Sequence, residues 1–206
     1  MSWVYGNRFL TESEMQNNAK IIYSYLKARG WTLNAIAGML GNMQTESSIN
    51  PAIWQNLDYG NTSLGYGLVQ WTPSTNYTNW ANTKGYDITN GDYQLQWIDE
   101  ETVNFGQWIA TGDYDISFDT FKSSTETPEY LAGAFLKNFE RAGVEVLEER
   151  QTQARSWYVY LITSGGGIST DTSGGGTGTT NKKRKGFNFV LHNYRRRERQ
   201  WRKQKF

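Results

Sequence analysis

The residue best placed to do chemistry in this sequence is Glu46, which ends an apolar helical pattern. The apolar positions of that pattern are Leu33, Ile36, Ala37, Leu40 and Met43. Because residues three or four apart share one face of a helix, the Glu46 carboxyl is expected beside the buried face. Partial burial and the negative end of the helix dipole both disfavour an ionised carboxyl. We therefore expect Glu46 to keep its proton near neutral pH and to be able to act as a general acid.

Other kinds of catalytic chemistry are limited by composition. The sequence has no cysteine and a single histidine, His192, so disulfides, thiolate metal sites and triads built on histidine are excluded or strongly disfavoured. We predict no metal and no cofactor. Nine Trp and thirteen Tyr exceed what a core of this size needs, so several rings should be exposed. Exposed flat rings suit sugars, bases or flat apolar surfaces.

The elements that must position Glu46 can be read from capping residues and periodicity. A capping box at Thr11 to Glu14 opens a first helix that ends at Gly30. The second helix, capped by Thr32, runs from about residue 33 to Glu46, and Asn50-Pro51 turns the chain away from it. Three glycines and several apolar residues in the segment 57–75 then favour a short, irregular hairpin over another helix.

The second half of the sequence predicts three further helices. Residues 74–91 are polar and read as a loop, and a helix then runs from near Asp92 to Gly112. The acidic residues Asp99, Glu100 and Glu101 are expected on a solvated face of that helix. Residues 113–127 read as a surface loop. A helix starts at Pro128 and continues to Gly143, and a last helix stops before Gly165.

The carboxyl-terminal part of the sequence has a different composition. Residues 164–181 are rich in Gly, Ser and Thr and predict a flexible linker. Residues 182–206 contain eleven Lys and Arg and one Glu, a net charge of +10, while residues 1–181 carry −9. The organisation is therefore a mainly α domain at 1–163 with a small β-hairpin insertion, a linker, and a basic aromatic tail at 182–206. The amino-terminal residues are too polar for a signal peptide, and no segment is long enough for a membrane span.

Two separated motifs resemble a known family. The sequence Glu-Ser-Ser-Ile-Asn-Pro at 46–51, followed by Gly-Tyr-Gly-Leu-Val-Gln-Trp at 65–71, resembles the signature of lysozyme-like domains. It is most similar to phage tail lysozymes and to the muramidase half of phage morphogenesis proteins of the phi29 type. The runs at 135–141 and 150–157 are also similar to the closing helices of that family, so the resemblance covers about residues 8–163. It implies a helical lysozyme-like fold in which Glu46 protonates the bond between N-acetylmuramic acid and N-acetylglucosamine.

Glycoside cleavage also needs a group that stabilises positive charge on the sugar or activates water. Asp58, twelve residues after Glu46 at the entrance of the expected hairpin, is the candidate, although it is as well explained as part of a turn. Some relatives use a single Glu. The residues expected to line the substrate groove are Trp54, Tyr59, Tyr66, Gln70 and Trp71. Trp71 is equally compatible with a place in the core.

Several alternatives remain open at this level. The leading hypothesis is a glycosidase of a phage particle that cleaves peptidoglycan during entry, and a lysin released during lysis fits nearly as well. The rival is a non-catalytic tail or wall-binding protein, which would have no need to keep Glu46. Hydrolase and lytic transglycosylase need the same acid. The basic tail could bind teichoic acid, nucleic acid, lipid head groups or an acidic virion subunit, or be solvated.

Overall fold

The computed structural model describes residues 1–142 and 146–164, so the basic tail and all of the predicted linker except Ser164 lie outside the described residues. Residues 1–161 form one unit. The elements in order are α1 (Glu12–Lys27), α2 (Leu33–Ser47), η1 (Gln55–Leu57), α3 (Thr75–Thr83), α4 (Gly91–Gln96), η2 (Trp97–Glu101), α5 (Phe118–Ser123), α6 (Pro128–Phe135), η3 (Leu136–Glu140) and α7 (Leu147–Ser164). The predicted mainly α fold is confirmed. Among the described residues, no helix is both long and apolar enough to cross a membrane.

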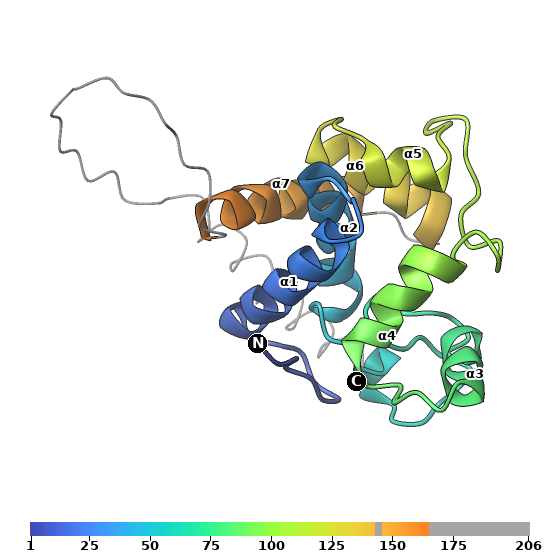
Figure 1. Cartoon of the computed structure of the whole chain (residues 1–206). Helices are drawn as coiled ribbons and strands as arrows, with labels where there is room; N and C mark the ends of the chain where they lie inside the picture. Colours follow the sequence, from blue (N-terminus) through green and yellow to red (C-terminus); the bar gives the residue numbers. More distant parts are fainter. Residues whose placement is uncertain (143–145, 165–206) are drawn as a thin grey trace, which may run out of the picture. The chain divides into compact units, whose positions relative to one another are not determined.

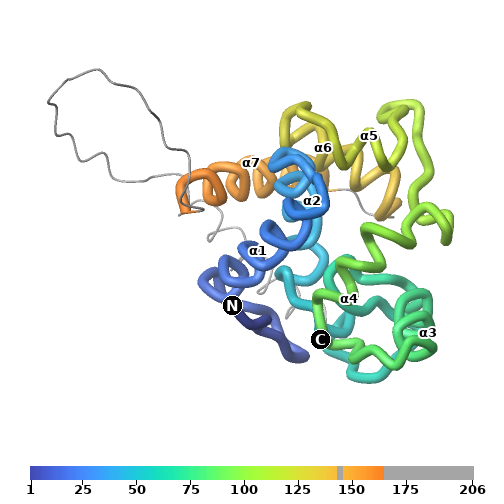
Figure 2. Tube along the Cα trace, viewed as in Figure 1, coloured from blue at the N-terminus to red at the C-terminus, as the bar shows by residue number. Residues whose placement is uncertain are grey.

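Helix α2 lies at the centre of this unit and contacts α1, α5 and α6 (Figure 2). Its central residues are buried on every side, as expected for a helix that other elements surround in the core. Two glycines allow its neighbours to come close. A Cβ on Gly38 would lie 2.9 Å from the backbone nitrogen of Ala132 on α6, and one on Gly41 would lie 2.8 Å from that of Ala154 on α7. The backbones of α6 and α7 therefore pack directly against α2.

The first two helices and the last follow the prediction closely. Glu14 accepts a hydrogen bond from the Thr11 backbone N–H at 2.8 Å, which completes the expected capping box of α1. Thr32 caps α2, its hydroxyl accepting a hydrogen bond from the Ala35 N–H at 3.1 Å. The apolar residues Met15, Ala19, Ile22 and Leu26 of α1, spaced by three or four, are buried. Capping residues and clean periodicity are local signals, which explains why these boundaries could be read without the fold.

Two regions expected to be loops contain helices. Residues 75–83 form α3, and residues 118–123 form α5. In α3 the apolar residues are only Tyr77, Trp80 and Ala81, at the helical spacing of three and four, and the polar residues between them hid the pattern. In α5 the pair Phe118 and Phe121 is buried in the same way. The loop predictions were wrong because so short an apolar stripe depends on tertiary packing.

The helix predicted from Asp92 to Gly112 is also shorter than expected. After α4 the chain forms the π-helical turn η2, which ends at Glu101, and a non-helical turn continues to Gly106, whose φ is +62°. The Ile109 N–H instead donates to the carbonyl of Asn138 at 2.9 Å, and its side chain is exposed. In the acidic cluster Glu100 is exposed as predicted, but Asp99 and Glu101 do not lie on a solvated face. Asp99 accepts a hydrogen bond from Trp31 Nε1 at 2.7 Å, and Glu101 accepts one from Trp80 Nε1 at 3.1 Å.

The predicted hairpin insertion contains no continuous β-strand. It contains isolated antiparallel bridges that join Tyr66 to Trp54 and to Trp71. The segment is held by side-chain hydrogen bonds instead, mainly from Gln94 of α4. Its Oε1 accepts the Leu68 N–H at 2.8 Å, and its Nε2 donates to the Pro51 carbonyl at 2.6 Å. A side chain at Gly67, whose φ is +80°, would collide with that amide, so glycine is required there.

Candidate active site

Glu46 lies in the last turn of α2 and forms an ion pair with Arg150 of α7. The distance from Arg150 Nη2 to Glu46 Oε1 is 2.5 Å, and the two side chains are 3% and 19% exposed. Arg150 Nη1 donates to Asn42 Oδ1 at 3.0 Å, and Asn42 donates in turn to the carbonyls of Gly38 and Ala132. This buried network of Arg150 and Asn42 therefore fixes the Glu46 carboxyl, which keeps a small accessible surface.

The position of Arg150 follows from the close packing of α7 on α2. A Cβ at Gly41 would collide with the Arg150 carbonyl oxygen, so only glycine allows α7 this close. Further polar contacts fix the same interface, since Thr45 donates to Gln153 at 2.8 Å and Trp157 donates to Gln44 at 2.8 Å. The guanidinium reaches Glu46 from a helix 104 residues later in the chain.

The backbone after Glu46 adopts an uncommon conformation. Ser48 and Ile49 have φ values of 53° and 55°, in the left-handed region that β-branched residues rarely enter. Such residues cost about 1–3 kcal/mol each and persist only where the surroundings enforce them. Here the Ser47 hydroxyl donates to the Leu68 carbonyl at 2.8 Å, which joins the end of α2 to the segment 65–71.

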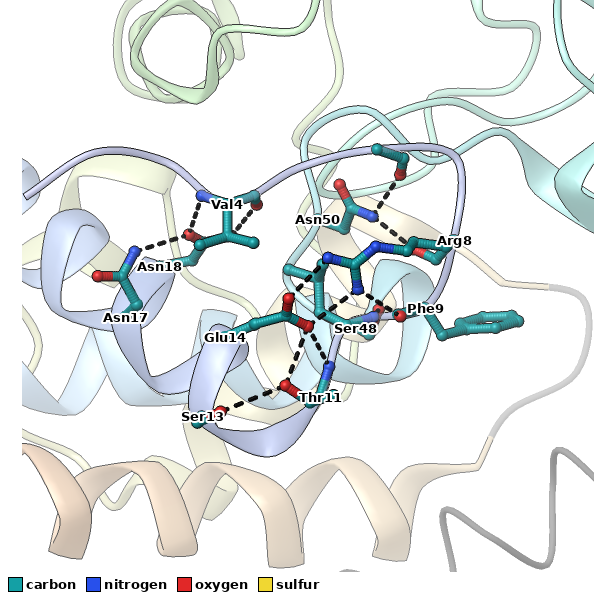
Figure 3. A network of polar contacts seen from close by, with 12 residues as sticks. Val4, Arg8, Phe9, Thr11, Ser13, Glu14, Asn17, Asn18, Ser48 and Asn50 are labelled. Carbon is teal, nitrogen blue, oxygen red and sulfur yellow. Dashed lines mark hydrogen bonds and ion pairs between the residues drawn. The ribbon is translucent and has the colours of Figure 1, made fainter.

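The amino-terminal segment enforces the same conformation from the other side (Figure 3). Asn50 donates to the carbonyls of Gly6 and Arg8 at 2.7 and 2.6 Å. The Leu10 N–H donates to Ser48 Oγ at 2.9 Å, and Asn18 of α1 donates to the Ile49 carbonyl at 2.9 Å. Residues 1–10 thus act as a strap over the turn that follows Glu46.

The strap is anchored to α1 by a salt bridge between Arg8 and Glu14, with an Nη2–Oε1 distance of 2.6 Å. Hydrogen bonds from Arg8 and from the Thr11 backbone lower the pKa of Glu14 to about 2. The carboxylate therefore stays ionised down to strongly acidic pH, and its contribution to the strap is lost only as the pH falls from about 4.5 toward 2.

The rings expected to line a substrate groove are distributed differently. Trp54, Tyr66 and Trp71 are buried, and Trp71 stacks on Tyr77 with ring centroids 4.6 Å apart. Their packing supports the core interpretation that was left open for Trp71. Tyr59 is 80% exposed and is therefore the ring of this set that is available to a ligand.

Gln70 is half-buried and has a φ of 49°. Its amide donates to the carbonyls of Ile53 and Gly67 at 3.1 and 3.0 Å. The side chain therefore closes the turn of the segment 65–71 from within. A role for Gln70 in binding substrate stays a prediction.

Asp58 lies on an exposed turn after η1. Its Oδ2 accepts a hydrogen bond from Asn61 Nδ2 at 2.8 Å, and its carbonyl accepts the Asn61 N–H at 3.2 Å. None of the interactions of the described residues joins Asp58 to Glu46. The expected catalytic role of Asp58 is therefore left untested by its contacts, because paired catalytic carboxyls need not bond to each other.

A different carboxyl lies close to Glu46. Glu140 is the last residue of η3, and its Oε1 is enclosed without a hydrogen-bond partner. Burial and the charge of Glu46 raise the pKa of Glu140 well above its usual range, and Arg150 and Arg141 lower it only in part. Sequence reasoning missed both Glu140 and Arg150. Both lie inside the two runs noted only as similar to the closing helices of the family, which was the available signal.

No group of three or more His, Cys, Asp or Glu side chains suited to a metal ion occurs within residues 1–142 and 146–164. The site joins the carboxyl of Glu46 to the buried guanidinium of Arg150, with the carboxyl of Glu140 in the same charged cluster.

Comparison with known proteins identifies the family to which this domain belongs. The model of the family described as phage tail lysozyme matches residues 17–161. Morphogenesis protein 1 of Bacillus phage B103 is 51% identical over 159 residues, which make up 77% of this chain and 43% of that relative. The chain thus spans less than half the length of this relative. The matched region holds Glu46, Asn42, Glu140 and Arg150, and the chain belongs to the phage tail lysozyme family.

Proposed function

We propose that the domain cleaves the glycan strands of peptidoglycan between N-acetylmuramic acid and N-acetylglucosamine, with Glu46 as the general acid. The observation that carries this proposal is the position of Glu46. It is a carboxyl at the end of a buried helix, held by Arg150 at 2.5 Å, with a fraction of its surface open to a ligand. Membership in a family of lysozymes supports the reaction type.

In the proposed reaction Glu46 donates its proton to the glycosidic oxygen. The bond from that oxygen to the anomeric carbon of the muramic acid breaks, and the electron pair stays on the departing sugar oxygen. The positive charge on the muramic acid is then captured either by water, which leaves a reducing sugar, or by the sugar's own 6-hydroxyl, which leaves a 1,6-anhydro ring. Glu46 ends the step as a carboxylate paired with Arg150, and a proton released in the capture restores it.

The surroundings of Glu46 suit this role because they hold the carboxyl in one place. A general acid contributes only when it lies within hydrogen-bond distance of the atom it protonates. The strap, the Ser47 hydrogen bond and the Asn42–Arg150 network all restrict the end of α2. Among the predicted lining residues, Tyr59 has the exposed ring that could stack on a sugar face.

The decisive test replaces Glu46 by Gln. We expect clearing of purified peptidoglycan to fall about a hundredfold or more, because the amide cannot donate the proton. The matched control is Glu148→Gln, which changes an exposed carboxyl in the first turn of α7 and should keep full activity. Circular dichroism checks that both variants fold. Unchanged activity in the Glu46 variant would remove Glu46 from the mechanism, and mass spectrometry of the digest identifies the product.

A second candidate is a structural role in the particle without catalysis. It is favoured by the name of the relative, a morphogenesis protein. In that case the domain would bind peptidoglycan or other tail proteins, and Glu46 would serve only to pair with Arg150. Full-length protein that sediments with peptidoglycan but releases no muropeptides, before or after the Glu46 substitution, would favour this role. In either case we propose that the protein is part of the virion and acts at the cell wall.

A further inference from the structure

Glu140 lies beside the Glu46–Arg150 ion pair and has no part in the mechanism above. Its Oε1 is enclosed and makes no hydrogen bond, and the Nε of Arg150 is enclosed in the same way. The other side of the guanidinium is occupied, since Nη1 donates to Asn42 and Nη2 donates to Glu46. The Nε of Arg150 is thus a donor without a partner, and Oε1 of Glu140 is an acceptor without a partner, in the same charged cluster.

The backbone fixes Glu140 in this place. Residues 136–140 form the π-helical turn η3, and Arg141 ends it with a φ of 48°. Single π-helical turns within helices are frequent at functional sites because they redirect side chains. The Arg141 guanidinium donates to the carbonyls of Asn138, at 3.0 Å, and of Gln107, which holds the turn in position.

If both carboxyls were ionised, the enclosed part of the cluster would hold two negative charges against one positive charge, because Arg141 is exposed. The charged groups that act on Glu140 are Glu46 from α2, Arg150 from α7 and Arg141 at the end of its own turn. Two carboxylates against the buried Arg150 would leave an excess negative charge in an enclosed place, which is costly. The pKa of Glu140 is raised well above its usual range by burial and by Glu46. Carboxyls that interact strongly titrate as a pair.

We propose that Glu140 is a positioning residue that competes with Glu46 for Arg150, so that the two carboxyls hold one proton between them. This proposal rests on the proposed role of Glu46 as the acid. When Arg150 pairs with Glu46, the proton resides on Glu140. When the charge of Arg150 is taken up by Glu140, Glu46 holds the proton and is ready to donate it. The number of protons and the net charge of the cluster are the same in both arrangements.

The first test is the pH dependence of kcat/KM for the full chain acting on peptidoglycan, with and without Glu140→Gln. Without a competing carboxyl, Arg150 acts on Glu46 alone and favours its ionised form. We expect the alkaline limb of the profile to move about one pH unit lower, a loss of about tenfold at alkaline pH that disappears at low pH. The control Glu148→Gln should leave the limb in place. A loss that is uniform across pH, or an unmoved limb, would overturn the proposal.

The second test does not depend on catalysis or on the stability of a variant. In the unaltered protein, the side-chain carboxyl carbons of Glu46 and Glu140 are followed by NMR as the pH is varied. We expect each resonance to report the titration of both groups, in two steps. Independent single-step curves would contradict the shared proton even if the protein proves to be an active glycosidase. Coupled curves in a protein without glycosidase activity would instead refute the proposed function and leave the coupling intact.

Discussion

The end of α2 and the turn at residues 55–61 each carry a carboxylate, Glu46 and Asp58, twelve residues apart in the sequence. The surroundings of the two carboxylates in the fold differ. Glu46 is held by a buried arginine, and the backbone after it is fixed by three separate segments. Asp58 is exposed and bonds only within its own turn, to Gln55 and Asn61. The contrast shows that a carboxylate becomes a defined chemical group where several elements converge on it.

The same contrast applies to the backbone. Both regions contain consecutive non-glycine residues with positive φ, Ser48 and Ile49 in one and Asn56 and Leu57 in the other. At the end of α2 the residues are buried and tied to α1, to the amino-terminal strap and to the segment 65–71. At the turn they are exposed. The Leu57 carbonyl also accepts a hydrogen bond from Asn7 of the strap at 2.9 Å, but the contacts that enforce the conformation at the end of α2 come from three segments.

The largest effect that would sharpen this comparison is expected from Arg150→Met. Removing the guanidinium leaves Glu46 and Glu140 without their buried cation, and breaking a buried pair costs about 3–5 kcal/mol. We expect the free energy of unfolding, measured by urea denaturation, to fall by about 3 kcal/mol. The control is Arg155→Met, on the same helix, whose side chain is 77% exposed and whose salt bridge to Glu129 should contribute less than about 1 kcal/mol. Equal effects of the two substitutions would mean that Arg150 is not the organising contact.

A smaller effect compares one residue type in the two regions. Asn50→Ala removes two hydrogen bonds to the strap, at 2.7 and 2.6 Å, and one to the Ala52 N–H, in a fully buried place. We expect a loss of about 2 kcal/mol, because the N–H of the buried Ala52 loses its acceptor and two hydrogen bonds to the strap are lost as well. Asn61→Ala removes hydrogen bonds of an exposed turn and should cost less than about 1 kcal/mol. Thermal melts of both variants check the difference, and a costlier Asn61 change would reverse the ranking of the two regions.

The smallest effect is expected from Asp58→Asn. Because Asp58 is exposed and bonded within its own turn, turnover on peptidoglycan should fall by less than about threefold, far below what loss of a catalytic carboxyl causes. A loss of about a hundredfold would show instead that Asp58 reaches the substrate and acts as the second carboxylate. Measuring Asp58→Asn beside Glu46→Gln in the same assay places the two carboxylates on one scale.

Part of the fold and of the site could be predicted from the sequence. The capping box at Thr11, the cap at Thr32 and the apolar periodicity determined helices α1 and α2, because these are interactions within one or two turns. The same local pattern placed Glu46 at the end of α2. The two motifs at 46–51 and 65–71 pointed to the lysozyme-like family, since each motif is a contiguous stretch of the sequence.

The tertiary structure alone decided which groups meet Glu46. Arg150 and Glu140 come from elements about a hundred residues later, and their approach depends on Gly38 and Gly41, whose role is visible only when α6 and α7 are packed against them. Tertiary packing also decided that Trp54, Tyr66 and Trp71 are buried and that Tyr59 is exposed. Periodicity tells which face of an element is apolar, but it does not tell which other element will cover that face. The partners of a buried charge are therefore set by the fold as a whole.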